Sequence, residues 1–374
     1  MKVIAFYLPQ YHPVAENNEW WGPGFTEWTN VAKSRPRYRG HYQPHIPADT
    51  GFYDLRCPES RELQATLASN AGIYGFCYYH YWFNGRRLLN QPIDAVLSSG
   101  KPTLPFCFCW ANESWTRSWD GKSGEVLIKQ NHSIEDDKKH IEWLLPVFKD
   151  ARYIKINGRP LFLIYRTDII PNISDMLSLW RRRAISSGFP ELYVCAVRSN
   201  FINASNDELI AFGFDGIVDF QPSVEAFPKR NIAKRGIRYT KIKLNHLLKN
   251  KLRMPQLSTI IKISYRKLMN NSIARLRGDK HKIFPCVIPS WDNSPRKQDS
   301  IIIQNDDPNE YGLWLDAACD LVQRRYQTDE NIVFINAWNE WGEGAHLEPD
   351  LRFGNQYLEI TKKIISNYNK TQVK

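Results

Sequence analysis

The fold follows from one stretch near the C-terminus, Asn331-Ile332-Val333-Phe334-Ile335-Asn336-Ala337-Trp338-Asn339-Glu340-Trp341-Gly342-Glu343-Gly344. Its apolar part, residues 332–337, predicts a strand that is buried on both faces, as in a parallel sheet covered on both sides. The strand ends in amide, indole and carboxylate side chains, and the glycines let the backbone turn sharply there. We interpret the stretch as a buried strand whose end carries chemistry.

The same pattern occurs eight times along the chain, and helix-like stretches separate the repeats. The predicted strands cover residues 3–8, 74–82, 103–111, 161–165, 192–197, 216–220, 284–289 and 332–337. Apolar residues at helical spacing predict helices at 60–71, 134–148, 311–324 and near 356–365. Eight such units predict an α/β fold, a closed (β/α)8 TIM barrel. A doubly wound open sheet is the alternative, but no Gly-x-Gly-x-x-Gly follows the first strand.

Length and charge indicate one domain with a distinctive insertion. The 374 residues allow two domains, but we predict a single barrel over 1–374 with a basic insertion at 228–282, between the sixth and seventh strands. The chain carries a net charge of +11, and the insertion alone has 17 Lys and Arg residues against one acid, Asp279. Apolar residues spaced among these basic ones include Ile242, Leu244, Leu247, Leu248 and Leu252.

The composition of the insertion suggests a partner. An amphipathic basic stretch suits peripheral contact with an anionic membrane surface. A solvated or partly disordered loop is the alternative. No nucleic-acid motif accompanies the charge, so we expect no nucleic-acid partner.

Cysteine usage and the absence of targeting signals favour a cytoplasmic protein. The apolar stretch at the N-terminus is too short for a signal peptide, and no run approaches the ~18 apolar residues of a membrane span. The seven cysteines are odd in number and mostly lie in apolar runs, which favours reduced, buried thiols. Cys107 and Cys109 share a strand face, but no partner pair follows at zinc-like spacing. We expect neither metal nor cofactor, and a cytoplasmic location with peripheral contact at the inner membrane through 228–282.

Glu340 and Glu343 are the predicted catalytic pair. Two nearby carboxyl groups can divide the cleavage of a glycosidic bond, one as general acid and the other as base or as stabiliser of the oxocarbenium-like state. The alternative is that both glutamates only bind substrate hydroxyls or pair with Arg198. Glu27 and Glu113 are further carboxylates that could replace one of the pair, although substrate binding is the favoured role for both.

Residues at the other strand ends and in the first loop form the predicted substrate-binding set. Active sites of such barrels lie at the carboxyl ends of the strands, and these positions carry aromatic, amide and charged side chains. The set comprises Tyr7, Gln10, His12, Glu27, Trp28, His80, Tyr81, Trp110, Asn112, Glu113, Tyr165, Arg198, Gln221, Trp291, Asp292, Asn339 and Trp341. Strand alternation predicts that about half of the strand-end tyrosines pack in the core instead.

Several motifs resemble a known family. They are AFYLPQYH (5–12), WWGPGFTEWTNV (20–31), WANESWTR (110–117), PSWDN (289–293) and WNEWGEG (338–344). They are similar to the WbsX-like family, whose members are usually described as glycosyltransferases of polysaccharide and O-antigen gene clusters. That family is similar in turn to glycoside hydrolase family 99, the endo-α-mannosidases, which are (β/α)8 barrels.

The resemblance implies a retaining mechanism. In family 99 a strand-end Glu-x-x-Glu motif supplies both catalytic carboxylates, and Glu340 and Glu343 match it. By motif position, Glu340 would act as base on the sugar 2-hydroxyl, which attacks the anomeric carbon and gives a 1,2-anhydro sugar. Glu343 would act as acid and then as base. Gly342 departs from the hydrolases, which commonly carry a bulkier residue there.

Three functions remain open from the sequence. The first is a carbohydrate-active enzyme that acts on glycosidic bonds of a bacterial surface polysaccharide, such as the O-antigen of lipopolysaccharide, or of its lipid-linked precursor. The second is a glycosyltransferase that uses an activated sugar donor, although no Asp-x-Asp metal site occurs and Asp306-Asp307 is better interpreted as a helix N-cap. The third is a non-catalytic sugar-binding protein.

Overall fold

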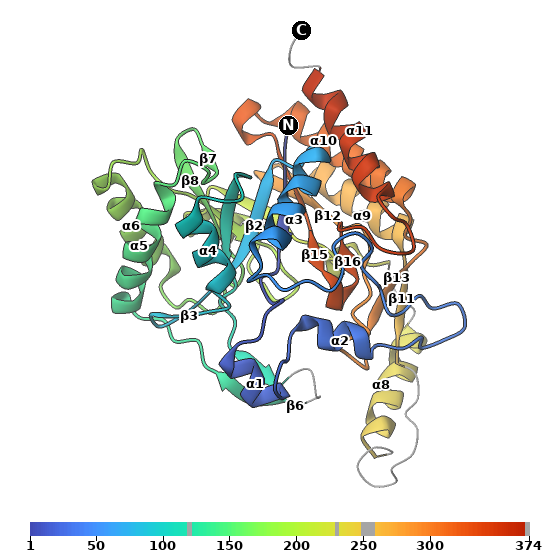
Figure 1. Cartoon of the computed structure of the whole chain (residues 1–374). Coiled ribbons are helices and arrows are strands. Elements are labelled where there is room, and N and C mark those ends of the chain that lie inside the picture. The colour runs from blue at the N-terminus through green and yellow to red at the C-terminus, as the bar shows by residue number, and fades with distance from the viewer. Residues whose placement is uncertain (118–121, 229–231, 248–258, 371–374) are drawn as a thin grey trace.

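Eight parallel strands close into a barrel in the computed structural model, which describes residues 1–117, 122–228, 232–247 and 259–370 (Figure 1). The barrel strands are β1 (Lys2–Tyr7), β2 (Gly75–Phe83), β4 (Phe106–Trp110), β8 (Arg159–Ile164), β9 (Tyr193–Val197), β10 (Gly216–Asp219), β12 (Ile283–Val287) and β14 (Ile332–Ile335). Neighbours pair in parallel in chain order, and β1 pairs with both β2 and β14, so the sheet has no open edge. The predicted (β/α)8 barrel is confirmed.

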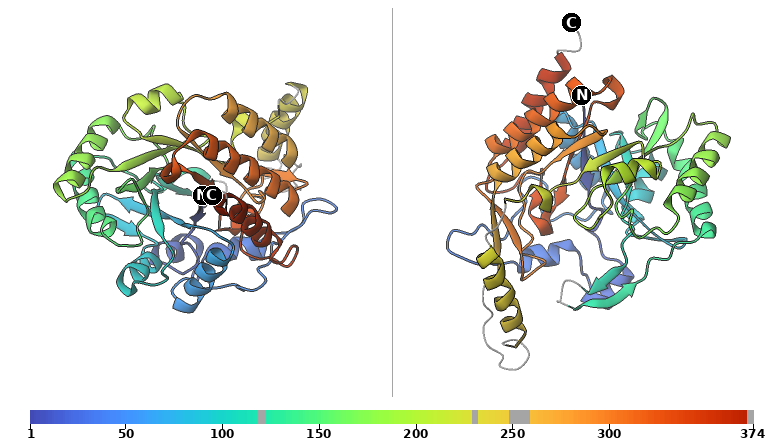
Figure 2. Two further views of the ribbon diagram at one scale, coloured as in Figure 1. Left: turned by 90° about the horizontal axis from the view of Figure 1, so that it is seen from above. Right: turned by 180° about the vertical axis from the view of Figure 1, so that it is seen from behind.

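Helices surround the strands, as the view along the barrel shows (Figure 2). They are α3 (Pro58–Asn70), α4 (Gln91–Ser99), α5 (Ile134–Phe148), α6 (Ile173–Ser186), α7 (Asn206–Ala211), α9 (Tyr265–Gly278), α10 (Pro308–Arg325) and α11 (Gln356–Lys370). Side-chain caps fix where three of them begin, and at α7 the Ser205 hydroxyl accepts from the Glu208 backbone N–H. The Ser133 hydroxyl accepts from the Asp136 backbone N–H at α5, and the Asp307 carboxylate accepts from two N–H groups at α10. The predicted N-cap is therefore confirmed.

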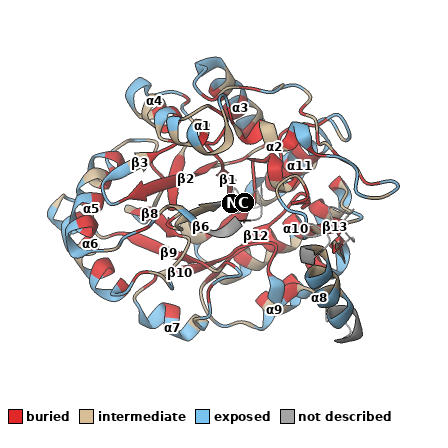
Figure 3. Ribbon diagram, turned by 90° about the horizontal axis from the view of Figure 1, so that it is seen from below, coloured by how far each residue is buried: buried red, intermediate tan, exposed pale blue. Residues whose placement is uncertain are grey.

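The core lies inside the barrel and between the barrel and the helices. Every residue of β2, β4, β9, β10, β12 and β14 is buried, which is why these strands are apolar on both faces (Figure 3). Aromatic rings fill the interior: the Phe6 ring centroid lies 5.6 Å from that of Tyr79 and 5.2 Å from that of Phe220. The seven cysteines are free thiols, and six of them are buried.

Long connections cover the carboxyl ends of the strands. The first loop, which the sequence presents as an aromatic connection, contains α1 (Ala15–Trp21) and α2 (Glu27–Lys33). After β4 the chain forms the hairpin of β5 (Trp115–Arg117) and β6 (Lys122–Ile128). After β14 it forms β15 (Asn339–Glu340), the 3-10 turn η5 (Trp341–Glu343) and β16 (Ala345–His346). These segments lie at the same end of the barrel (Figure 1).

The basic segment 228–282 has two parts. Its first part contains α8 (Ile232–Leu247), which extends away from the barrel at the end where α1 and α2 lie (Figures 1 and 2). In its second part, β11 (Ile261–Ser264) pairs with β13 (Ile301–Gln304) in a separate two-stranded sheet, and α9 is the helix of the barrel ring between β10 and β12. The Tyr265 hydroxyl of α9 donates to the Ile288 carbonyl at 2.5 Å.

Two further points concern the predicted membrane contact. Leu248 and Leu252 lie outside the described residues, as does the side chain of Leu247. Within the described residues, no helix combines the length and the apolar character needed to cross a membrane.

Candidate active site

The two predicted catalytic carboxylates lie at the carboxyl end of the barrel, where a single arginine joins them. Arg296 Nη2 lies 2.5 Å from Glu340 Oε1, and Arg296 Nη1 lies 3.1 Å from Glu343 Oε1. The third nitrogen, Arg296 Nε, donates to Glu27 Oε1 at 2.7 Å. The alternative that the pair binds Arg198 is wrong, because Arg198 pairs with Glu225 at 2.9 Å.

A cavity of about 710 Å³ lies beside this cluster. Both glutamates line it, together with Arg296 and Lys297. Its remaining walls are mostly aromatic and polar, and include Gln10, Trp20, Trp21, Tyr79, Tyr81, Glu113, Trp115, Gln130, His132, Tyr165, Arg166 and Phe201. Indole and phenol rings beside paired carboxylates are the surfaces that a sugar ring needs: stacking for its apolar face, and hydrogen bonds for its hydroxyls.

Burial controls the charge of Glu340. The residue is 5% exposed, and this loss of hydration raises the pKa of its carboxyl group to about 8. Arg296 opposes the rise, while Glu343 and Glu27 add to it through like charge. Burial disfavours the charged guanidinium, but the three carboxyl groups outweigh that effect and raise the pKa of Arg296.

A second buried network fixes the backbone that carries the pair. The Asn339 side chain accepts from the Leu8 N–H at 2.8 Å and donates to the Leu8 carbonyl at 3.0 Å, which ties β15 to the end of β1. The Trp341 indole N–H donates to Glu348 at 2.7 Å, and its ring stacks on His346 with centroids 3.7 Å apart. Glu348 also accepts from Tyr53 at 2.8 Å, and burial raises its pKa to about 7.

Four members of the predicted substrate-binding set line the cavity: Gln10, Tyr81, Glu113 and Tyr165. Glu113 pairs with Arg166, with their atoms 2.7 Å apart, and both residues line the cavity. Tyr81 lies edge-on to Trp115, with centroids 5.3 Å apart. The structure therefore brings these four together with Glu340 and Glu343.

The rest of the set lies outside the cavity lining. These residues are Tyr7, His12, Glu27, Trp28, His80, Trp110, Asn112, Arg198, Gln221, Trp291, Asp292, Asn339 and Trp341. Those within the barrel strands, which are Tyr7, His80 and Trp110, point toward the helices, because side chains alternate across a sheet. Tyr7 donates to Gln64 of α3 at 2.6 Å, and His80 pairs with His140 of α5 at 2.9 Å. Trp110 packs on Trp180 of α6.

Other members of the set brace loops at the same end. The Asn112 side chain accepts from the Arg166 N–H at 2.8 Å. Asp292 binds His41 at 2.6 Å and Gln43 at 2.7 Å, and its backbone N–H donates to the Glu343 carbonyl at 2.7 Å. Asn112 and Asp292 thus hold loops near the cavity. Their positions do not support direct contact with a substrate.

The predicted set misses several cavity residues, among them Arg296 and Lys297. Both lie in the loop after β12, well beyond the end of the strand. A prediction based on strand ends therefore does not include them. The signal available was the continuation of the PSWDN motif into Ser294-Pro295-Arg296.

One group of described residues has the composition of a metal site: His45, His346 and Asp350, whose candidate ligand atoms lie within 4.8 Å of one another. The two imidazoles already take part in hydrogen bonds. His45 Nδ1 lies 2.9 Å from His346 Nε2, and His346 Nδ1 lies 3.1 Å from the Glu348 carbonyl. We interpret the group as a support of the Trp341 ring.

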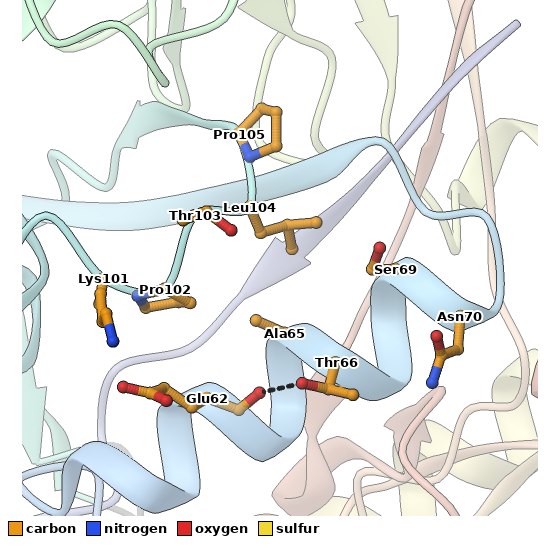
Figure 4. Close-up of a pocket in the computed structure, with 10 residues that line it drawn as sticks. All are labelled: Glu62, Ala65, Thr66, Ser69, Asn70, Lys101, Pro102, Thr103, Leu104 and Pro105. Carbon is orange, nitrogen blue, oxygen red and sulfur yellow. Dashed lines mark hydrogen bonds between the residues drawn. The ribbon is translucent and has the colours of Figure 1, made fainter.

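Another hollow, of about 460 Å³, lies between α3 and the loop before β4 (Figure 4). Its lining includes Glu62, Thr66 and Lys101. It opens at the amino-terminal end of the barrel, the end that serves stability in this fold. We assign it no ligand.

Known proteins share both the sequence and the fold. Residues 3–361 match the family described as Glycosyltransferase WbsX. Two proteins described as "Uncharacterized protein WxcX", from strains of Xanthomonas campestris pv. campestris, are each 37% identical over 365 residues, which is 97% of this chain and 49% of the relative. The chain thus spans about half the length of these curated relatives.

Solved structures show the same architecture. The GH99 endo-alpha-mannosidase from Bacteroides thetaiotaomicron superposes with a TM-score of 0.60 at 14% identity, over 100% of this chain and 98% of that one. A structure titled "Glycoside hydrolase-like protein" gives 0.58 at 14% identity, over 97% and 93%. At such identities the likeness shows the fold, whereas the sequence match shows the kinship: this chain belongs to the WbsX family.

Proposed function

We propose that this chain is a carbohydrate-active enzyme that acts on glycosidic bonds, with Glu340 and Glu343 as its catalytic pair. One observation carries the proposal: two carboxyl groups at a barrel strand end face one aromatic-lined cavity of about 710 Å³. Their different surroundings suit different tasks, because Glu340 is buried whereas the Glu343 side chain is 22% exposed.

The proposed route retains the anomeric configuration, as the resemblance to family 99 implies. Glu340 takes the proton of the sugar 2-hydroxyl, whose oxygen attacks the anomeric carbon. The bond from that carbon to the leaving oxygen breaks, and Glu343 gives the leaving oxygen a proton. A 1,2-anhydro sugar results. In the second half, Glu343 takes a proton from the incoming hydroxyl, which opens the three-membered ring while the sugar oxygen regains a proton from Glu340.

The incoming hydroxyl decides between two activities. Water would make the enzyme a hydrolase, and a sugar hydroxyl would make it a transglycosylase. The family description, Glycosyltransferase WbsX, favours transfer to a sugar acceptor. We propose a bacterial surface polysaccharide, or its lipid-linked precursor, as the substrate.

The proposed lipid-linked substrate agrees with the surface of α8. Its described residues expose Ile237, Tyr239 and Leu244, at 59%, 61% and 41%, next to basic side chains such as Lys243. Apolar and basic groups together suit the headgroup layer of an anionic membrane. Because α8 extends from the end of the barrel that holds the cavity, such contact would bring the site close to membrane-bound glycan (Figure 1).

The test offers lipid-linked and polymeric glycans to the wild type, to Glu340→Gln and to Glu343→Gln, and follows the products by mass spectrometry. Glu359→Gln, an exposed change on α11, is the matched control. Cleavage in water supports the hydrolase, and extension of an acceptor supports the transferase. Full activity in both cavity variants would refute the proposed pair, and binding without turnover by every protein would indicate a sugar-binding module.

The membrane proposal has its own test. Flotation with vesicles of anionic and of neutral lipid should differ, and the difference should shrink when Tyr239 and Leu244 are both replaced by serine. Equal flotation in both lipids would refute it.

A further inference from the structure

We propose that Arg296 is a positioning residue that holds the carboxylates of Glu340 and Glu343 at one face of the cavity, and that Glu27 of α2 holds Arg296 in turn. The inference deepens the proposed function and rests on it, since it concerns the same pair. It adds a charged link between the first loop and the catalytic strand end.

All three nitrogens of the Arg296 guanidinium contact carboxyl groups. Its three nitrogens face three carboxyl groups, at 2.7 Å for Glu27, 2.5 Å for Glu340 and 3.1 Å for Glu343. A planar fork with fixed donors defines the direction of each partner as well as its distance. The Glu27 side chain is fully buried and that of Arg296 is 11% exposed, so water competes little for these contacts.

Gly342 supplies the space for this arrangement. A Cβ at this position would lie 1.8 Å from Glu27 Oε1 and 2.8 Å from Arg296 Nε. Any side chain here would expel the Glu27–Arg296 pair. The ion pair therefore depends on the glycine, although residues 27, 296 and 342 are far apart in sequence.

The same ion pair connects helix α2 to Glu340 and Glu343. The Glu27 N–H donates to the Gln10 carbonyl at 3.2 Å, which anchors the start of α2 at the end of β1. A correctly folded first loop thus positions Glu27, and Glu27 orients Arg296. Arg296 in turn holds together two carboxyl groups, of which Glu343 opposes the ionisation of Glu340 through like charge.

Charge around Glu340 comes from few groups. Arg296, Glu343 and Glu27 are the charged groups that act most strongly on Glu340, and Lys297, Glu113 and Arg166 line the same cavity. The phenols of Tyr11, Tyr79, Tyr81 and Tyr165 lie around this cluster. Burial raises the pKa of each phenol, so all four stay neutral. Changes at Arg296 and at Glu27 must then move the Glu340 titration in opposite directions.

The experiment measures that titration directly, by NMR of the 13C-labelled Glu340 carboxyl group, assigned with Glu340→Gln. Arg296→Met should raise the pKa of Glu340, since an opposite charge is lost. Glu27→Gln should lower it, since a like charge is lost. A residue that merely supports the fold would not shift the two variants oppositely. Because this readout needs no substrate, it decides the inference even where the proposed enzyme function fails.

Kinetics give the second readout. Gly342→Ala changes no charge but displaces the ion pair, so kcat should fall about 100-fold with KM less affected. Gly278→Ala is the matched control, because a Cβ there meets nothing within 4 Å. Arg296→Lys should keep the Glu340 pKa nearer to the wild-type value but lose kcat, because a lysine cannot bind three partners in a fixed plane. An unchanged titration in Arg296→Met, or equal kcat in the two glycine variants, would overturn the inference.

Discussion

Replacing Glu340 by glutamine should remove the loss in the free energy of unfolding that ionisation of Glu340 causes as the pH rises. The pKa of this carboxyl group moves from a reference value of 4.5 to about 8 on folding. A group whose pKa is raised by folding contributes most stability below its unfolded pKa, and this contribution is lost as the pH rises through the folded pKa. The wild type should therefore lose stability relative to Glu340→Gln between about pH 4.5 and pH 8.

The size of the effect follows from the slope. Within this window the folded carboxyl group is protonated and the unfolded one is ionised, so each pH unit costs about 1.4 kcal/mol. Two units, from pH 5.5 to pH 7.5, correspond to about 3 kcal/mol. Glu340→Gln also removes one partner of Arg296, and the free-energy cost of that loss does not depend on pH. It therefore cancels when the difference between the two proteins is compared at two pH values.

The assay is urea unfolding of the wild type, Glu340→Gln and the surface control Glu359→Gln at both pH values. The gap between the wild type and Glu340→Gln should change by about 3 kcal/mol in favour of the variant as the pH rises, while the control keeps parallel behaviour. A gap that stays constant, or that moves in favour of the wild type, would refute the claim that burial of Glu340 outweighs its pairing with Arg296.

Further predictions concern the mechanism and the scaffold. If Glu340 is the base, kcat/KM should rise with pH up to about 8, because only about one tenth of a group with that pKa is ionised at pH 7; a fall through pH 8 would assign it the acid role instead. Trp341→Phe leaves a buried acceptor on Glu348 without its indole partner and should lower the free energy of unfolding by about 1–3 kcal/mol, measured in urea. Trp115→Ala should raise KM about tenfold or more by removing a wall of the cavity, and unchanged KM would exclude the ring from binding. Asp307→Ala should cost about 0.5–2 kcal/mol in thermal or urea unfolding without changing kcat.

The barrel could be predicted because burial on both faces leaves an obvious trace in the sequence. The helix expected at 134–148 is observed as Ile134–Phe148, and each of the eight predicted strands has a counterpart. The first loop was harder. Its aromatic residues hid α1 and α2, which are short and depend on packing at the barrel mouth. The basic segment was predicted as one insertion because charge dominates its composition, although α9 within it completes the barrel.

The site could be predicted only in part, because a strand end does not reveal which way a side chain points. Tyr81 reaches the cavity, whereas His80, its neighbour, faces the helices and contacts His140. A shift of one position exchanges the two faces, so motif position alone could not separate them. Arg296 was missed for another reason: it lies close to the PSWDN motif (289–293), but its role depends on a loop folding back across the barrel mouth, which the motif alone does not indicate.

Gly342 shows how a departure from a family pattern can be explained physically. The resemblance to family 99 implies a bulkier residue between the two glutamates, so in the sequence Gly342 looks like the loss of a side chain. In the structure, the missing side chain is the space that Glu27 and Arg296 fill, with an ion pair 2.7 Å long. Gly342 therefore leaves room for two side chains from distant loops, and one of them, Arg296, places a positive charge between the carboxyl groups of Glu340 and Glu343.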